Sequence, residues 1–295
     1  MRWIGSAALC VAACGRLEFD PRIDAARNGG IDAPADTPPC AFGPWQTPQP
    51  ITELNTATDD LGGQITPDGL ALYFDNGLGA VRGIWVARRA SRVDPFGPAR
   101  RLTELDMSNV ISDPSTTGDE LELYFDTASG PGPCIWRATR ANITDPFGSL
   151  TRLDALCSGN VAGANISSDG LTLYYNSQIG GPEGELYVTT RASRADSFSP
   201  GIKVPVLAGG AAKGYAAASA DRLTLYYETG VTVELWQVTR ADRGAAFENP
   251  MMVPGVDTGS GDEDASITAD GTELFFSSSR ANGIADLYVA KRSCL

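Results

Sequence analysis

The 295-residue chain contains no histidine. This absence excludes the usual Ser-His-Asp and Cys-His nucleophilic sites and the metal sites that use histidine ligands. The sequence also lacks a Cys-x-x-Cys pair, so a zinc site has little support. No glycine-rich phosphate loop follows a strand and opens a helix, which leaves nucleotide binding without sequence support. Carboxylates are therefore the remaining candidates for chemistry.

Basic charge is scarce as well. The chain has 23 Lys and Arg residues against 36 Asp and Glu residues, and its formal net charge is −13. A nucleic-acid partner would need many phosphate contacts from basic side chains, so no such partner is expected. Acidity mainly favours solubility. We expect no cofactor, and the acidic charge is compatible with Ca²⁺ or with basic partners.

Helix signals are nearly absent, because no long apolar stripe with helical spacing follows residue 15. Instead, an apolar-aromatic triplet recurs five times, at steps of 51, 50, 52 and 49 residues. The triplets begin at Leu72, Leu123, Leu173, Leu225 and Leu274. A fixed period near 50 with several short strands per period predicts a β-propeller. The alternative is a sandwich built from unrelated β-hairpins.

Further landmarks keep the same register. An Arg follows the aromatic residue of the next strand by four positions in every copy: Arg89, Arg140, Arg191, Arg240 and Arg292. We interpret this Arg as structural, bridging adjacent loops, because a single site cannot need all five. Asp-Gly pairs such as Asp68-Gly69 predict the tight turn between the first two strands. Copy four has Asp221-Arg222 there, and copy two is expected to form a longer turn over 117–120.

The fifth copy stops at Leu295, before its fourth strand, and the missing strand lies at the other end of the chain. The segment 42–44 matches 96–98, and 51–54 matches 102–105. We predict that this N-terminal strand pairs into the last blade and closes the ring, which leaves no open sheet edge there. The predicted fold is all-β: a five-bladed β-propeller of four-stranded antiparallel blades over residues 40–295.

The segment 166–174, with the sequence ISSDGLTLY, resembles the WD40-like β-propeller repeat of TolB-type periplasmic proteins. The resemblance covers roughly residues 42–295. It implies the fold and does not imply an activity. TolB itself is expected to have more blades and a second domain, so its partners are not carried over.

Residues 1–13 are predicted to be a lipoprotein signal peptide, with Arg2 before a short apolar core. The stretch Val11-Ala12-Ala13-Cys14-Gly15 resembles a bacterial lipobox, which makes Cys14 the expected site of lipid attachment. The alternative is an ordinary secretory signal with an incidental cysteine. Residues 14–39 are rich in turn formers and are predicted to be a flexible tether. We therefore expect a lipid-anchored protein of the bacterial cell envelope, at the outer membrane.

Four cysteines follow the lipobox: Cys40, Cys134, Cys157 and Cys294. An even number in an exported chain predicts disulfides. The repeat register aligns Cys294 with Ser91 and Cys40 with Asp94, and both aligned positions lie in one loop, so Cys40 should pair with Cys294. Cys134 begins the third strand of blade two and Cys157 ends the antiparallel fourth strand, which predicts the second pair.

Five-bladed propellers are also a scaffold of glycoside hydrolases, where paired carboxylates flank the sugar bond. The acidic residues near inner strands are Asp59, Asp60, Asp113, Asp262, Glu263 and Asp264. Asp113, Glu263 and Asp264 are the candidates for contact with a ligand or Ca²⁺. The structural alternative is that such residues cap turns or face water. We assign no catalytic residue.

The favoured hypothesis is a monomeric, non-catalytic binding or scaffolding module for an envelope protein. Its contact surface would lie on Gly/Pro-rich rim loops at 78–83, 130–133 and 180–184. The alternative is a glycan-binding or glycoside-hydrolase-like propeller that uses the carboxylates at the channel mouth. A third hypothesis is a structural lipoprotein without a defined ligand.

Overall fold

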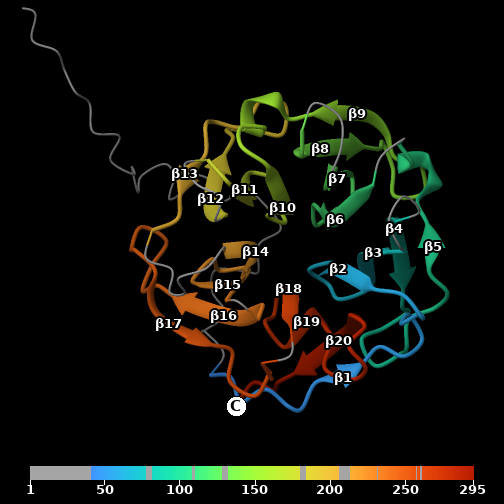
Figure 1. Ribbon diagram of the computed structural model, residues 1–295, viewed down its shortest axis with the longest axis vertical. Coiled ribbons are helices and arrows are strands. Elements are labelled where there is room, and N and C mark those ends of the chain that lie inside the picture. Colours follow the sequence, from blue (N-terminus) through green and yellow to red (C-terminus); the bar gives the residue numbers. More distant parts are fainter. Residues whose placement is uncertain are drawn as a thin grey trace, which may run out of the picture.

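The computed structural model describes residues 41–77, 82–107, 110–127, 132–179, 184–205, 213–230, 232–256, 258–259 and 261–295. Five four-stranded sheets stand around a common axis, as Figure 1 shows. Neighbouring strands within each sheet are antiparallel. The predicted five-bladed, all-β propeller is confirmed.

The blades follow one another along the chain, and the first strand of each repeat lies nearest the axis (Figure 1). Blade one contains β2 (Asp60–Ile65), β3 (Ala71–Asn76), β4 (Gly83–Arg88) and β5 (Arg100–Arg101). Blade two contains β6 (Ile111–Thr116), β7 (Glu122–Thr127), β8 (Cys134–Thr139) and β9 (Gly148–Arg152). Blade three contains β10 (Val161–Ile166), β11 (Thr172–Ser177), β12 (Glu185–Thr190) and β13 (Ile202–Lys203). Blade four contains β14 (Lys213–Ala218), β15 (Thr224–Thr229), β16 (Glu234–Thr239) and β17 (Glu248–Met252). Blade five contains β18 (Asp262–Ile267), β19 (Glu273–Ser278), β20 (Asp286–Lys291) and the N-terminal β1 (Gln49–Pro50).

The helical content of the described residues is two single turns of 3-10 helix, η2 (Thr103–Leu105) and η3 (Asp154–Leu156). The fourth strand of blade one is short, since β5 ends at Arg101 and η2 follows. No helix in the described part of the chain is long and apolar enough to cross a membrane.

The repeated Arg ties two loops of its own blade together. Arg89 Nε donates to Gly69 O at 2.6 Å, and its guanidinium lies 4.8 Å from the centre of the Phe96 ring. The same pair of contacts recurs at Arg140, Arg191, Arg240 and Arg292, which lie over Phe147, Phe198, Phe247 and Phe42. A cation over an aromatic face is attractive. The structural interpretation of the Arg residues is confirmed.

The turn of copy two is not longer than the others, which corrects that prediction. Glu120 N donates to Thr117 O at 2.8 Å, the same bond that Gly69 N makes to Thr66 O at 2.8 Å. Glu120 takes the place of the turn glycine with a φ of 57°, against 77° for Gly69. A left-handed backbone costs a residue with a Cβ about 1–2 kcal/mol. Charge-assisted bonds offset that cost, since Arg88 Nη1 donates to Glu120 Oε1 at 3.0 Å.

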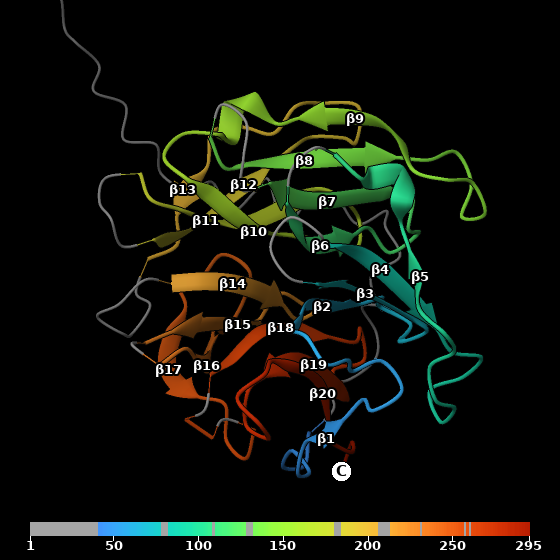
Figure 2. The ribbon, with the colours of Figure 1, turned by 45° about the vertical axis from the view of Figure 1, so that its right-hand side comes forward.

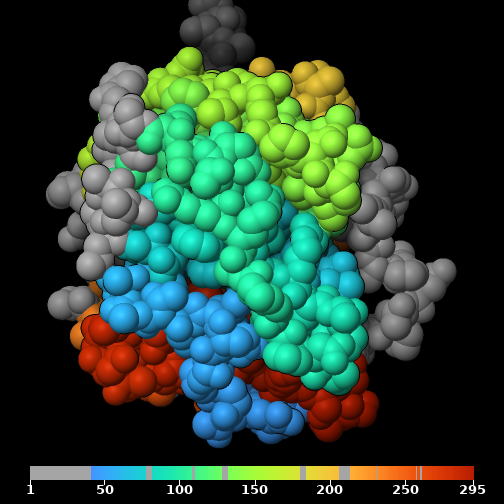
Figure 3. Space-filling view, turned by 90° about the vertical axis from the view of Figure 1, so that its right-hand side faces the viewer, coloured from blue at the N-terminus to red at the C-terminus, as the bar shows by residue number. Residues whose placement is uncertain are grey.

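The N-terminal segment closes the ring as predicted, through a slightly earlier stretch than 51–54. In β1, Gln49 pairs with Val289 and Pro50 pairs with Tyr288 of β20. Figure 2 shows the blue N-terminal strand beside the red strands of blade five. Figure 3 shows the blue residues in contact with the red ones on the outside of the ring. Leu295 N also donates to Ala41 O at 2.7 Å, so the two ends of the described chain meet.

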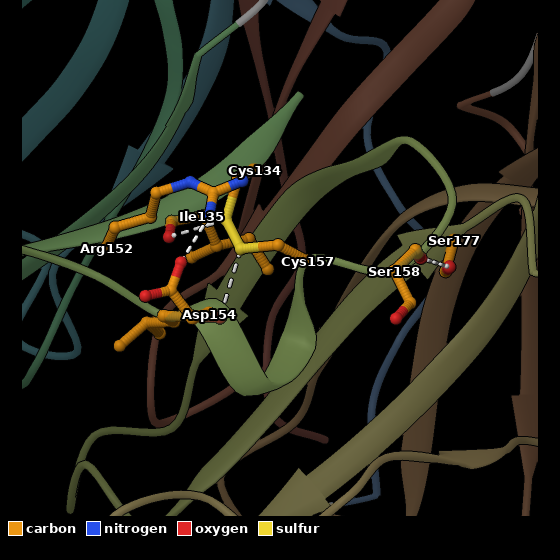
Figure 4. Close-up of a disulfide and its surroundings, with 8 residues drawn as sticks. Cys134, Ile135, Arg152, Asp154, Cys157, Ser158 and Ser177 are labelled. Carbon is orange, nitrogen blue, oxygen red and sulfur yellow. Dashed lines mark hydrogen bonds and ion pairs between the residues drawn. A yellow bond between two sulfur atoms is a disulfide. The ribbon is translucent and has the colours of Figure 1, made fainter. Parts of the chain in front are cut away.

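A disulfide joins Cys134 at the start of β8 to Cys157 after η3, with the two Cα atoms 5.0 Å apart (Figure 4). This predicted pair is confirmed. Cys40 lies outside the described residues, so the Cys40–Cys294 pair stays a prediction. Cys14, the signal peptide and the tether also lie outside the described residues.

We expect the double change Cys134→Ala and Cys157→Ala to lower the free energy of unfolding by about 3 kcal/mol. The bridge closes a loop with a sequence separation of 23 residues, and restricting the unfolded chain by such a loop accounts for this amount. Urea unfolding followed by tryptophan fluorescence measures the change. Untreated wild-type protein serves as the control. A loss below about 0.5 kcal/mol would contradict the expectation.

Candidate functional site

Every inner strand contains a β-bulge at the same height in the ring. The aligned bulge positions are Gly62, Asp113, Gly163, Tyr215 and Asp264. Four of them have positive φ angles of 63°, 56°, 64° and 57°, the exception being Tyr215. Bulges break the alternation of side chains along a strand. The bulge lies within each inner strand, so that β2, for example, starts at Asp60 and continues past Gly62 to Ile65.

These bulges surround a cavity of about 30 Å³ on the axis of the ring. Asp113 and Asp264 line it together with Gln64, Asn165 and Tyr215. One water needs about 10–15 Å³ of such space, so the cavity has room for one or two waters or for one ion. A sugar ring does not fit there.

Tyr215 reaches across the channel. A Cβ on Gly163 would lie 2.7 Å from the Tyr215 ring, so the ring packs directly on the backbone of blade three. The Tyr215 hydroxyl continues to blade two and donates to Asp113 Oδ2 at 2.6 Å. One side chain of blade four thus fills much of the centre of the ring.

Carboxylates from the second strands of the blades bind the bulges of the next blades. Asp75 Oδ1 accepts from Asp113 N at 3.1 Å, and Asp126 Oδ1 accepts from Gly163 N at 3.3 Å. Glu228 Oε2 accepts from Asp264 N at 3.3 Å. Such bonds satisfy backbone groups that the bulge removes from the ladder. These carboxylates are part of the scaffold.

Blade five has Ser277 at the position of these carboxylates. Asp264 takes over the role from the inner strand, since its Oδ2 accepts from Gly62 N at 2.9 Å. Asp264 Oδ1, however, has no hydrogen-bond partner among the described residues, although Asp264 as a whole is only 7% exposed.

Burial and mutual repulsion raise the pKa values of this group of acids. Burial and the charge of Asp113 raise the pKa of Asp75 and the pKa of Glu263 to about 7. Burial also raises the pKa values of Asp126, Glu228 and Asp264 well above their ordinary range. Arg82 Nε lies 2.8 Å from Asp75 Oδ2 and opposes the shift there. The site therefore combines many carboxyl groups with few cationic side chains.

Three of the sequence candidates are loop caps. Asp60 Oδ2 accepts from Thr56 N at 2.6 Å, and Asp59 Oδ1 accepts from Ala285 N at 3.1 Å. Asp262 Oδ2 accepts from Thr258 N at 2.8 Å, and Asp262 Oδ1 lies 2.7 Å from Arg280 Nη2. For these three residues the structural alternative holds.

Two of the remaining candidates converge, since Asp113 and Asp264 line the same cavity. Glu263 precedes Asp264 in β18 and is not among the lining residues. The sequence reasoning missed Asp75, Asp126, Glu228 and Tyr215. The first three come directly after the apolar-aromatic triplet of their repeats, so a comparison of that position across copies would have revealed them. Tyr215 aligns with Asp113 in the same way.

A second hollow opens at the opposite end of the channel, where the inner strands lead into their turns. Its volume is about 80 Å³. Small and polar side chains line it, among them Thr116, Ser167, Ser219 and Arg222. Arg222 Nη2 donates to Asp169 Oδ2 at 2.7 Å, across the boundary between blades three and four.

We expect the stability of the protein to fall as the pH rises from 5 to 8 in EDTA-containing buffer. An acid whose folded pKa is about 7 binds more protons in the folded than in the unfolded protein. Its contribution to stability is therefore fully present below about pH 4, and it is lost as the pH rises from about 4 to the folded pKa of about 7. Ion pairs lower the pKa values of Asp169 and Glu273, and their contribution is lost only below about pH 4. The melting temperature should therefore peak near pH 5.

Differential scanning calorimetry from pH 4 to pH 8 measures this profile. Each tenfold change in proton affinity is worth about 1.4 kcal/mol, so we expect the melting temperature to fall by several degrees between pH 5 and pH 8. Asp75→Asn keeps the shape and the acceptor oxygen and should make the profile flatter. A melting temperature that stays constant or rises between pH 5 and pH 8 would rule out these shifts.

Comparisons with known proteins support the fold. No protein-family model matches the chain. No curated protein matches it either. Among solved structures, TolB from Acinetobacter baumannii is similar with a TM-score of 0.55 and 14% identity, over 81% of this chain and 56% of that one. The chain thus spans about half the length of that TolB.

Glycoside hydrolases are similar to the same degree. A thermostable family-43 glycoside hydrolase has a TM-score of 0.57 and 13% identity, over 80% of this chain and 89% of that one. An α-L-arabinofuranosidase from Podospora anserina, solved with cellotriose, has a TM-score of 0.57 and 10% identity, over 85% and 97% of the two chains. Identities this low establish a shared propeller fold and no shared activity.

Proposed function

We propose that the propeller is a non-catalytic binding module of the bacterial cell envelope that holds a protein partner on one face of the ring. One observation carries this proposal: the channel is filled. Its two described cavities measure about 30 and 80 Å³. Sites for small organic ligands usually measure about 300–1,000 Å³. A partner therefore meets the faces of the ring and not its interior.

The face that carries the loops between second and third strands is the better candidate. These loops include the predicted rim loops, of which residues 78–81, 130–131 and 180–183 lie outside the described residues. They start and end beside the first residues of the inner strands, as the pairing of Asn76 with both Asp60 and Gly83 shows. This is the acidic end of the channel, which favours a partner with a basic contact patch.

Photocrosslinking in cells tests the proposal. Ile179 is 44% exposed at the start of the rim loop of blade three, and Val93 is 92% exposed in a loop on the opposite face. We expect a photoreactive amino acid at Ile179 to capture an envelope protein that the same amino acid at Val93 does not capture. Capture from Val93 alone would place the partner on the other face. No capture from either position, with abundant folded protein, would count against a protein partner.

A lipid anchor on Cys14 is part of the same proposal. If Cys14 carries the lipid, Cys14→Ser should move the protein from the membrane fraction to the soluble fraction and lower the mass of the mature chain by the mass of the lipid. Fractionation followed by intact-mass measurement checks both effects. An unchanged mass and an unchanged membrane fraction would remove the lipobox from the proposal.

The alternative, a glycoside-hydrolase-like propeller, predicts enzymatic activity. A glycosidase needs two carboxylates about 5–10 Å apart that face one substrate-sized cavity. Here Asp113 and Asp264 line a cavity of about 30 Å³, which has room for one or two waters. We therefore expect no release of sugar from aryl arabinosides or aryl xylosides. A rate above background that Asp113→Asn and Asp264→Asn both abolish would establish the enzyme.

A further inference from the structure

We propose that the cavity on the axis of the ring binds one hard cation, with Ca²⁺ the first to test, between the carboxylates of Asp113 and Asp264. The proposal concerns the stability of the ring and does not depend on the partner proposed above. The same ion would join blade two to blade five across the channel.

The donor atoms around the cavity define the class of ion. The polar side chains that line it carry carboxylate, amide, hydroxyl and phenol oxygens, from Asp113, Asp264, Gln64, Asn165, Ser266 and Tyr215. Neither a thiol nor an imidazole lines it, because the chain has no histidine and no cysteine lies among the lining residues. Oxygen ligands suit Ca²⁺, Mg²⁺ and Na⁺ rather than zinc or copper.

An unpartnered oxygen points to a missing ligand. Asp264 is 93% buried, since its exposed fraction is 7%, and it lines the cavity. Its Oδ2 accepts from Gly62 N, while its Oδ1 accepts no hydrogen bond from any described residue. A buried polar atom without a partner is costly and rare in folded proteins. A cation in the cavity would satisfy this oxygen.

The charge around the cavity is also unbalanced. Five acids close to it form no ion pair with a Lys or Arg of the described residues: the buried Asp126, Glu228 and Asp264 and the half-buried Asp113 and Glu263. Arg82 pairs with Asp75 and does not reach the others within ion-pair distance. Buried carboxylates are normally paired, protonated or bound to a metal. Tyr215 supplies one hydrogen bond to Asp113 but no cationic charge.

The geometry sets the strength of the site. No group of three or more acidic side chains in the described residues could hold a metal ion by itself. The ion would therefore have two carboxylate ligands, and neutral protein oxygens and waters would complete its shell. Few charged ligands give weak sites, and Ca²⁺ sites of extracellular modules have Kd values of about 10⁻⁴–10⁻³ M. We expect a Kd in that range.

Isothermal titration of the chelator-treated, full-length folded protein with CaCl₂, MgCl₂ and NaCl tests the proposal. We expect one Ca²⁺ per chain, and a rise of about 3 °C in the melting temperature at 10 mM Ca²⁺. Asp264→Asn keeps the acceptor oxygen for Gly62 N, and Asp113→Asn keeps the acceptor for Tyr215. Each should weaken Ca²⁺ binding at least tenfold.

Asp106→Asn is the matched control, because it removes the same charge from an exposed residue that pairs with Arg101 on the outer side of blade one. It should bind Ca²⁺ like the wild type. Saturable binding of Na⁺ or Mg²⁺ that the two cavity variants lose would support the same site with another hard ion. No saturable binding of any of the three ions would overturn the proposal. Equal binding by the wild type and both cavity variants would overturn it too. If one cavity variant fails to fold, Ca²⁺ binding by the other variant still tests the proposal.

Discussion

Deletion of residues 41–56 is expected to abolish the folded propeller. The deletion removes β1 and the side chains of Ile51 and Leu54, which are 5% and 4% exposed in the hydrophobic core between blades five and one. Burying two such side chains is worth about 3–6 kcal/mol, against a total stability of about 5–15 kcal/mol for most domains. The deletion also leaves β20 with an open edge.

The effect extends beyond those two side chains. Phe42 lies under the Arg292 guanidinium, and Trp45 packs against the core of blade five and the same guanidinium. Gln46 N donates to Lys291 O at 2.8 Å, and Ile51 N donates to Leu287 O at 2.9 Å. We expect loss of the cooperative thermal transition, or aggregation, in calorimetry and size-exclusion chromatography. Deletion of residues 16–39 is the control and should leave the transition unchanged. A stable monomer without residues 41–56 would refute ring closure.

Arg191→Ala is expected to lower the free energy of unfolding by about 3–5 kcal/mol. Arg191 Nη2 lies 2.6 Å from Glu122 Oε2, and the two side chains are 1% and 9% exposed. Removing one partner of a buried ion pair leaves the other charge buried without compensation, which is strongly destabilising. The substitution also removes the bond from Arg191 Nε to Gly170 O and the contact with the Phe198 ring.

Arg194→Ala provides the comparison in the same blade boundary. Arg194 pairs with Asp119 at 2.6 Å, but the two side chains are 31% and 32% exposed. Exposed ion pairs are worth about 0–1 kcal/mol. Urea unfolding of the two variants should separate them by at least 2 kcal/mol. Equal losses would mean that burial does not decide the value of these pairs.

The repeat explains why the sequence predicts so much of this fold. The triplets, the Arg and the Phe recur because every blade needs the same contacts, so five weak signals reinforce one another. The closure of the ring followed from the same register, since Phe42 occupies in blade five the place of Phe96 in blade one. The Cys134–Cys157 bridge followed from the antiparallel neighbours that the register defines.

The site is harder to predict, because it depends on where the repeats differ. Gly62 and Asp113 share one backbone conformation at aligned bulges, yet only the aspartate places a carboxylate on the axis. A bulge has no fixed sequence pattern apart from a residue that tolerates positive φ, which glycine and aspartate both do. The alignment of the copies gives Tyr215 its place at the bulge, but it does not predict the hydrogen bond to Asp113, because that bond joins blade four to blade two.

The hydrogen bond between Leu295 and Ala41 makes the chain suitable for circular permutation. Because the two ends of the described chain touch, a short linker could join them and new ends could be cut in a loop between other blades. Such circular permutants would keep all five sheets, but a different blade would be built from both ends of the chain. Comparing their refolding rates would show whether folding begins from any blade or from the one that two distant segments of the chain share.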